Sequence, residues 1–79
     1  MKQPTIIKSI WDNRGKTLDR FTIVLNYMET NIHNAMLCLS VDAVAFSQYS
    51  HGEEGDHLGD KIEWNDLNEN LQQHIIGRV

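Results

Sequence analysis

Apolar and polar residues alternate most regularly over residues 19–26, and this segment predicts a β-strand. Phe21, Ile23 and Leu25 occupy every second position and give the strand one apolar face. A second apolar segment, Thr5–Trp11, precedes it, and a short stretch rich in Asp, Asn and Gly separates the two. The pattern therefore predicts a hairpin of two strands.

The run Ala35–Val41 predicts a third strand, and it is largely apolar in both phases of the alternation. Such a strand is typical of the middle of a sheet that is covered on both faces. The following segment, Asp42–Ser50, fits either a helical turn or an irregular edge. Three glycines in Ser50–Gly59 predict an exposed loop, and Asp60–Trp64 predicts a short fourth strand.

The last part of the chain predicts an amphipathic helix. We expect Asp66 to be its N-cap, because Glu69 three residues later would complete a capping box. The spacing of the following residues predicts one buried stripe. This stripe consists of Leu67, Leu71, His74 and Ile75. The sequence as a whole predicts a single domain over residues 1–79, of the α+β class: a small antiparallel sheet of three to four strands with the C-terminal helix packed on one face.

Length and charge narrow the range of functions. The chain has 79 residues and a formal net charge of −4, and residues 51–79 hold seven acidic and two basic side chains. An acidic chain without a basic stripe argues against binding nucleic acid, since such binding depends on Lys and Arg. The same charge argues against an anionic membrane surface. The first eight residues contain no continuous apolar run, so we expect no signal peptide and a cytoplasmic protein.

The sequence shows no set of residues that is typical of an enzyme. Cys38 is the only cysteine and lies in an apolar run, which favours a buried thiol over a nucleophile. No Gly-x-Ser-x-Gly motif is present, and the P-loop pattern that Gly15-Lys16-Thr17 suggests is incomplete. We therefore favour a protein that is not an enzyme and that needs no cofactor.

One alternative is a metal site in the predicted loop. Imidazole and carboxylate groups are the ligands that zinc, manganese or nickel would use, and the loop offers His51, Asp56 and His57, with His74 of the helix as a further ligand. Two glycines between the histidines would leave these ligands poorly fixed, so a solvated loop is the simpler interpretation.

A second alternative is a binding site for a small polar ligand on the predicted hairpin. Both charges occur there within nine residues, which suits a polar small molecule. The candidate ligand-binding residues are Asp12, Asn13, Lys16, Asp19 and Arg20. In the structural interpretation, the same Asp and Asn side chains simply stabilise their own turn.

The acidic part of the chain is a candidate surface for partner proteins. Glu53 and Glu54 would supply negative charge, and an exposed Trp64 would be an effective contact for a partner, although a tryptophan is more often part of a core. An acidic patch of this kind would also suit an inhibitor that imitates nucleic-acid phosphates and blocks a basic groove of a host protein.

Residues 11–22, Trp-Asp-Asn-Arg-Gly-Lys-Thr-Leu-Asp-Arg-Phe-Thr, carry a recognisable motif. The motif resembles the start of a family of short phage and mobile-element proteins, which reads Asp-Asn-x-Gly-Lys-Thr-x-Asp-Arg-Tyr/Phe-Thr before an apolar strand. The similarity extends over most of the chain, although Asn68 stands where the family has a proline at the start of its helix. The resemblance implies a phage or prophage origin and a bacterial cytoplasm, and it implies no particular activity.

Together these observations favour a small, non-enzymatic accessory protein of phage or prophage type that acts by binding another protein. We expect a host or phage protein as the partner, and neither nucleic acid nor a membrane. A small sheet also has unpaired edges, and pairing between two copies would give a homodimer. The metal-binding or small-ligand-binding protein and the acidic inhibitor remain the alternatives.

Overall fold

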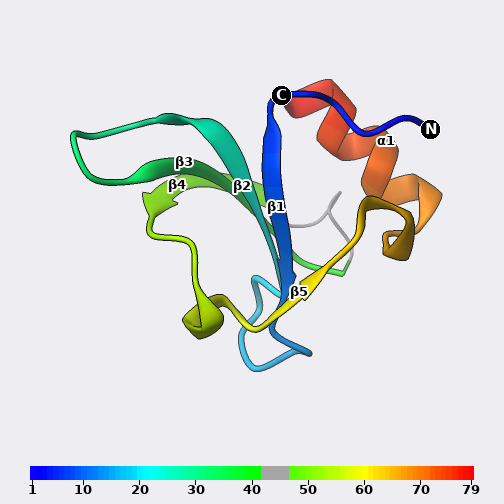
Figure 1. Ribbon diagram of the computed structural model, residues 1–79. Helices are drawn as coiled ribbons and strands as arrows, with labels where there is room; N and C mark the ends of the chain where they lie inside the picture. Colours follow the sequence, from blue (N-terminus) through cyan, green and yellow to red (C-terminus); the bar gives the residue numbers. More distant parts are fainter. Residues whose placement is uncertain (42–46) are drawn as a thin grey trace.

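The computed structural model describes residues 1–41 and 47–79 (Figure 1). These residues form an antiparallel sheet with the strand order β4-β3-β2-β1-β5, followed by a C-terminal helix. The fold is therefore α+β as expected, but it has five strands where three to four were predicted. The strands are β1 (Ile7–Asp12), β2 (Phe21–Met28), β3 (Asn34–Leu39), β4 (Ser47–Gly52) and β5 (Asp60–Ile62).

The main core lies between the sheet and the C-terminal segment. Ile23 and Leu37 are fully buried, and they face each other across β2 and β3. Leu71 and Ile75 of helix α1 (Glu69–Arg78) belong to the same buried cluster, so the helix packs on this face of the sheet. The prediction of a helix packed on one sheet face is confirmed. Of its predicted stripe, Leu71 and Ile75 are buried on the helix, whereas Leu67 precedes the helix and His74 is only half-buried.

The opposite face of the sheet carries a smaller core. Trp11, Val24 and Met36 are buried together, and Cys38 and Leu58 pack against them. Neighbouring residues of β3 thus contribute to different cores, because successive side chains of a strand point to opposite faces. The expectation that the third strand is covered on both faces is confirmed.

The start of the helix differs from the prediction. Asn68, not Asp66, is the N-cap, and its side chain accepts a hydrogen bond from the backbone N–H of Leu71 at 2.9 Å. Asp66 instead ends a separate 3-10 turn, η2 (Trp64–Asp66), where its carboxylate accepts from the N–H of Glu63 at 2.8 Å. Leu67 then adopts an extended conformation, which separates this turn from the helix.

The predicted loop over residues 50–59 is only partly a loop. Its first residues belong to β4, which pairs with β3 along its whole length. A second 3-10 turn, η1 (Asp56–Leu58), follows before β5. Residues 42–46 of the segment predicted to be either a helical turn or an edge lie outside the described residues, whereas residues 47–50 are strand.

In the part of the chain that the structure describes, no helix has the length and apolar character needed to cross a bilayer.

Candidate functional site

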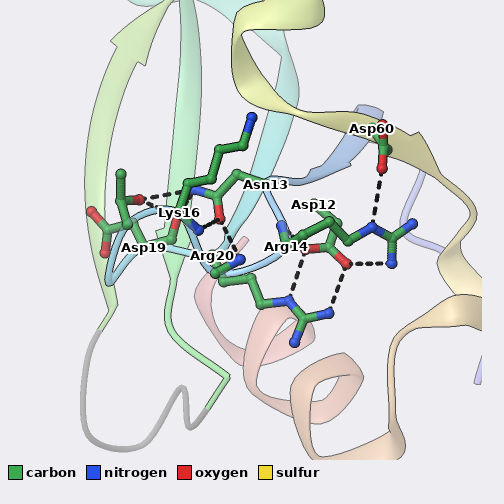
Figure 2. A network of polar contacts seen from close by, with 9 residues as sticks. Asp12, Asn13, Arg14, Lys16, Asp19, Arg20 and Asp60 are labelled. Atoms are coloured by element: carbon green, nitrogen blue, oxygen red, sulfur yellow. Dashed lines mark hydrogen bonds and ion pairs between the residues drawn. The ribbon is translucent and has the colours of Figure 1, made fainter.

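The turn between β1 and β2 holds a network of ion pairs around Asp12 (Figure 2). Asp12 ends β1 and is only 2% exposed. Its carboxylate accepts two hydrogen bonds from the guanidinium of Arg20, at 2.8 Å from Nε and 3.0 Å from Nη2. It also accepts the backbone N–H of Arg14 at 2.8 Å. Such a bidentate ion pair between Asp12 and Arg20 fixes the geometry of both side chains.

The ionisation of this pair is shifted toward the charged forms. Hydrogen bonding to Arg20 lowers the pKa of Asp12 below its ordinary value, although burial of the carboxyl opposes the change. The same hydrogen bond raises the pKa of Arg20. Asp12 and Arg20 therefore carry opposite charges throughout the neutral pH range.

Arg14 extends the network to β5, the edge strand that pairs with β1. Its Nη1 lies 3.0 Å from the carboxylate of Asp12, and its Nε donates to Asp60 of β5 at 3.0 Å. Arg14 has a positive φ of 61°, which turns the backbone immediately after β1. The side chain thus connects β1 with a strand that is distant in sequence.

Asn13 closes the turn through both ends of its side chain. Its Oδ1 accepts the backbone N–H groups of Gly15 and Lys16 at 2.9 and 3.1 Å. Its Nδ2 donates to Thr17 Oγ1 at 2.9 Å and to the backbone carbonyl of Asp19 at 3.0 Å. This residue therefore acts as the structural centre of the turn, which is the structural interpretation of the motif.

The five predicted ligand-binding residues do not converge on one point. Asp12 and Arg20 bind each other, while Asp19 points to the other side of the turn and accepts from Gln48 of β4 at 3.0 Å. Figure 2 shows the Lys16 side chain extending away from the ion pair. Arg20 and Asp12 do border a cavity of about 360 Å³, but their charges are already matched within the chain.

The predicted metal ligands are not brought together. His51 lies in β4, whereas Asp56 and His57 lie in η1. Within residues 1–41 and 47–79, no three His, Cys, Asp or Glu side chains are placed to hold a metal ion. His51 instead stacks on His33, with 5.4 Å between the ring centroids. The described structure thus gives the metal hypothesis no support.

The predicted partner surface loses one of its residues. Trp64 is 5% exposed, lies in the main core and donates a hydrogen bond from Nε1 to the carbonyl of Met1 at 2.8 Å. The interpretation of Trp64 as an exposed contact is therefore wrong, because this large apolar side chain packs into the core formed by the sheet and the helix. Glu53 and Glu54 are exposed, and Glu54 lies 3.7 Å from Lys8.

Cys38 has no feature of a reactive thiol. It is half-buried on β3, and burial raises its pKa, with the nearby charge of Asp19 adding to the effect. A thiol with a raised pKa is mostly protonated at neutral pH and is a poor nucleophile.

A site that the sequence did not reveal lies on the helix side of β3 and β4. Tyr27 and Tyr49 are about half exposed there, on strands that flank β3. Together with neighbouring residues they border a cavity of about 360 Å³. Its lining residues are Tyr27, Glu29, Ala35, Tyr49, Ser50 and His51. The sequence did not reveal this site because Asp42–Ser50 fitted either a helical turn or an irregular edge and Ser50–Gly59 predicted a loop, so strand β4 was not recognised.

No protein-family model matches the chain, and the searches among curated proteins and among solved structures give no match either.

Proposed function

We propose that this chain is a non-enzymatic binding module whose strand β4 pairs with an extended segment of a partner protein. The observation that supports this proposal is the position of β4 at the end of the strand order. In the described part of the chain it pairs with β3 on one side only. The outer backbone groups of such a strand are a template for another strand, a mode by which many domains bind peptides.

The two edges of the sheet differ in how they are protected. β5 is three residues long and begins with the charged residues Asp60 and Lys61. β4 has six residues, Ser-Gln-Tyr-Ser-His-Gly, with neither proline nor an Asp, Glu, Lys or Arg side chain. Short edge strands, charges and prolines are the usual means of preventing edge pairing. Because β4 lacks all of them, it is the edge suited to a partner.

The partner that we propose is a host or phage protein in the bacterial cytoplasm. The resemblance of residues 11–22 to short phage and mobile-element proteins is the reason why we propose this setting and an accessory role. The structure adds a reason to assign binding to β4 and not to the motif itself. The side chains of Asp12, Asn13 and Arg20 are engaged within the chain.

Proline substitutions in β4 test the proposal with an internal control. Alternate N–H groups of an antiparallel edge strand point toward the neighbouring strand and toward solvent, so Ser50→Pro and His51→Pro affect opposite sides. One of them removes a hydrogen bond to β3 and lowers Tm by several degrees. The other removes an outward N–H, leaves Tm nearly unchanged and blocks the edge.

The folded variant with the blocked edge is then compared with the wild type as bait in a bacterial lysate, with quantitative mass spectrometry. Lys61→Ser, which alters the opposite edge, is the matched control. We expect proteins that the wild type and the control retain and that the blocked variant loses. Identical sets of retained proteins for all three baits would contradict the proposal. Sedimentation of the purified wild type identifies the other occupant, a second copy of the chain, if only the wild type and the control dimerise.

A further inference from the structure

The cavity beside β4 combines aromatic rings with an unpaired carboxylate. Its volume of about 360 Å³ is near the lower end of the range of roughly 300–1,000 Å³ that is typical of ligand sites. A cavity of this size suits a single long side chain better than a large cofactor. Its position next to the open edge places it within reach of a residue from a strand paired with β4.

Two tyrosine rings border the cavity from opposite sides of β3. Tyr27 comes from β2 and Tyr49 from β4, and they are 45% and 52% exposed. Ala35 of β3, the strand between β2 and β4, also lines the cavity and leaves space there because its side chain is small. The faces of aromatic rings carry negative potential and attract cations.

The carboxylate of Glu29 adds a negative charge to this wall. Among residues 1–41 and 47–79 it has no hydrogen bond or ion pair. The turn that carries it is ordered, since the N–H groups of Glu29 and Thr30 both donate to the carbonyl of His33, at 2.8 and 3.2 Å. An unpaired carboxylate on a residue that lines the same cavity as two tyrosines matches a cationic group.

The chain itself shows that one of these rings accepts a guanidinium. The Arg78 guanidinium carbon lies 5.0 Å from the centroid of the Tyr49 ring. The Tyr49 hydroxyl donates to the carbonyl of Arg78, which fixes the ring against the end of α1. A guanidinium is planar and weakly hydrated, so it stacks on aromatic faces better than an ammonium group does.

From these contacts we infer that the cavity binds the side chain of an arginine in the segment that pairs with β4. The inference rests on the proposed function, because an added strand would direct every second side chain to the helix side of the sheet. The net charge of −4 and the exposed Glu53, one residue beyond β4, would attract such a basic segment. The arginine would stack on the ring of Tyr27, since Arg78 already occupies Tyr49, and would approach Glu29.

The first experiment titrates the full chain with N-acetyl-arginine-N-methylamide and follows it by NMR. Saturable shifts confined to residues 27–29 and 49–51, with a dissociation constant in the millimolar range, are expected. The neutral citrulline analogue should bind at least about fivefold more weakly, since it lacks the charge, and the lysine analogue should fall between the two. Equal binding of the arginine and citrulline probes would overturn the inference, as would shifts that centre elsewhere.

Variants then test the individual contacts. Glu29→Gln and Tyr27→Leu should each weaken arginine binding about two- to fivefold, whereas Tyr27→Phe keeps the ring and should retain it. Glu69→Gln removes the same charge from the exposed start of α1 and should leave binding within about twofold of wild type. Equal losses for Glu29→Gln and Glu69→Gln would show attraction by net charge alone and would refute a built site.

This titration separates the inference from the proposed function. Free arginine needs no strand pairing, so a failed titration removes the arginine site and leaves the β4 edge to be judged by the proline variants. If instead arginine binds and the blocked edge loses no partner, the cavity is confirmed and the strand-pairing proposal fails.

Discussion

The close approach of two backbone segments at Gly59 gives the strongest prediction for stability. Gly59 immediately precedes β5 and has a φ of +112°. A Cβ atom at this position would lie 2.3 Å from the carbonyl oxygen of Asp12 and 2.6 Å from the Cα of Asn13. Both contacts are with backbone, so rotation of a side chain cannot relieve them. The substitution Gly59→Ala must therefore displace either the end of β1 or the start of β5.

The magnitude follows from two contributions. A residue other than glycine in this backbone region costs about 1–3 kcal/mol. Displacing the backbone also strains the pairing of β1 with β5 and the hydrogen bond from Arg14 to Asp60, so we expect a total loss of about 3–5 kcal/mol. A chain of 79 residues has a free energy of unfolding of only about 4–12 kcal/mol. Gly59→Ala should therefore remove a large share of the stability.

The assay is urea unfolding at 25 °C, followed by circular dichroism. Two other glycines are matched controls, because a Cβ at either would meet nothing within 4 Å. Gly15→Ala, with φ +88°, should cost only about 1–2 kcal/mol for the backbone conformation. Gly77→Ala, inside α1, should stabilise the chain by about 0.5–1 kcal/mol. If Gly59→Ala costs no more than Gly15→Ala, the argument from the close backbone contacts is refuted.

Three further predictions concern Asp12, Trp64 and Cys38. Arg20 holds the folded-state pKa of Asp12 below its ordinary value of 3.8, so the stabilisation from this ion pair is complete above that value and is lost as the pH falls through the folded-state pKa. Tm measured from pH 7 to pH 2 should therefore fall less steeply in Asp12→Asn than in the wild type, and equal slopes would contradict this. Trp64→Ala should lower the free energy of unfolding by about 3–5 kcal/mol in the same urea assay; a loss below about 1 kcal/mol would mean that the side chain is not part of the core. The raised pKa of Cys38 predicts slow reaction with Ellman's reagent at pH 8 and fast reaction in urea; equal rates would show that the fold does not protect the thiol.

Strands β1, β2 and β3 could be predicted from the sequence because each buries apolar side chains in the cores. β2 places alternate apolar residues in the main core, and the continuous apolar character of β3 reflects its contribution to both cores. The periodicity of apolar residues indicates which side chains are buried, and it does not indicate strands that are held by backbone pairing alone. The central strands and the docked helix therefore had clear signals.

Strand β4 had no such signal, because no residue on it belongs to either core. Backbone pairing with β3 specifies it, and that pairing depends on a neighbouring strand and not on a local pattern. The predicted start of the helix was wrong for a different reason. Asp66 fits the N-cap of a capping box in the sequence, but its carboxylate accepts the N–H of Glu63 at the start of η2. Asn68 is the N-cap of the helix instead.

The candidate site was hard to predict because the residues with conspicuous chemistry serve the fold. The carboxylate of Asp12 is shared by two arginines, and the Asn13 amide is used by its own turn. A motif rich in charged residues can thus offer little free charge to a ligand, since its acidic and basic side chains pair with each other.

The polar and aromatic groups that are free to bind a partner lie around β4, where the hydrophobic pattern of the sequence is weakest. Glu29 and Glu53 have no ion pair among the described residues, and the flanking tyrosines leave about half of their surface exposed. These groups surround the one long edge that carries neither proline nor an Asp, Glu, Lys or Arg side chain in the described sheet. An edge supplies backbone pairing without sequence preference, whereas a cavity with rings and a carboxylate selects one kind of side chain. Affinity from β4 and selectivity from the cavity would act together on the same partner segment, so loss of either should weaken binding and only loss of the cavity should relax its preference for arginine.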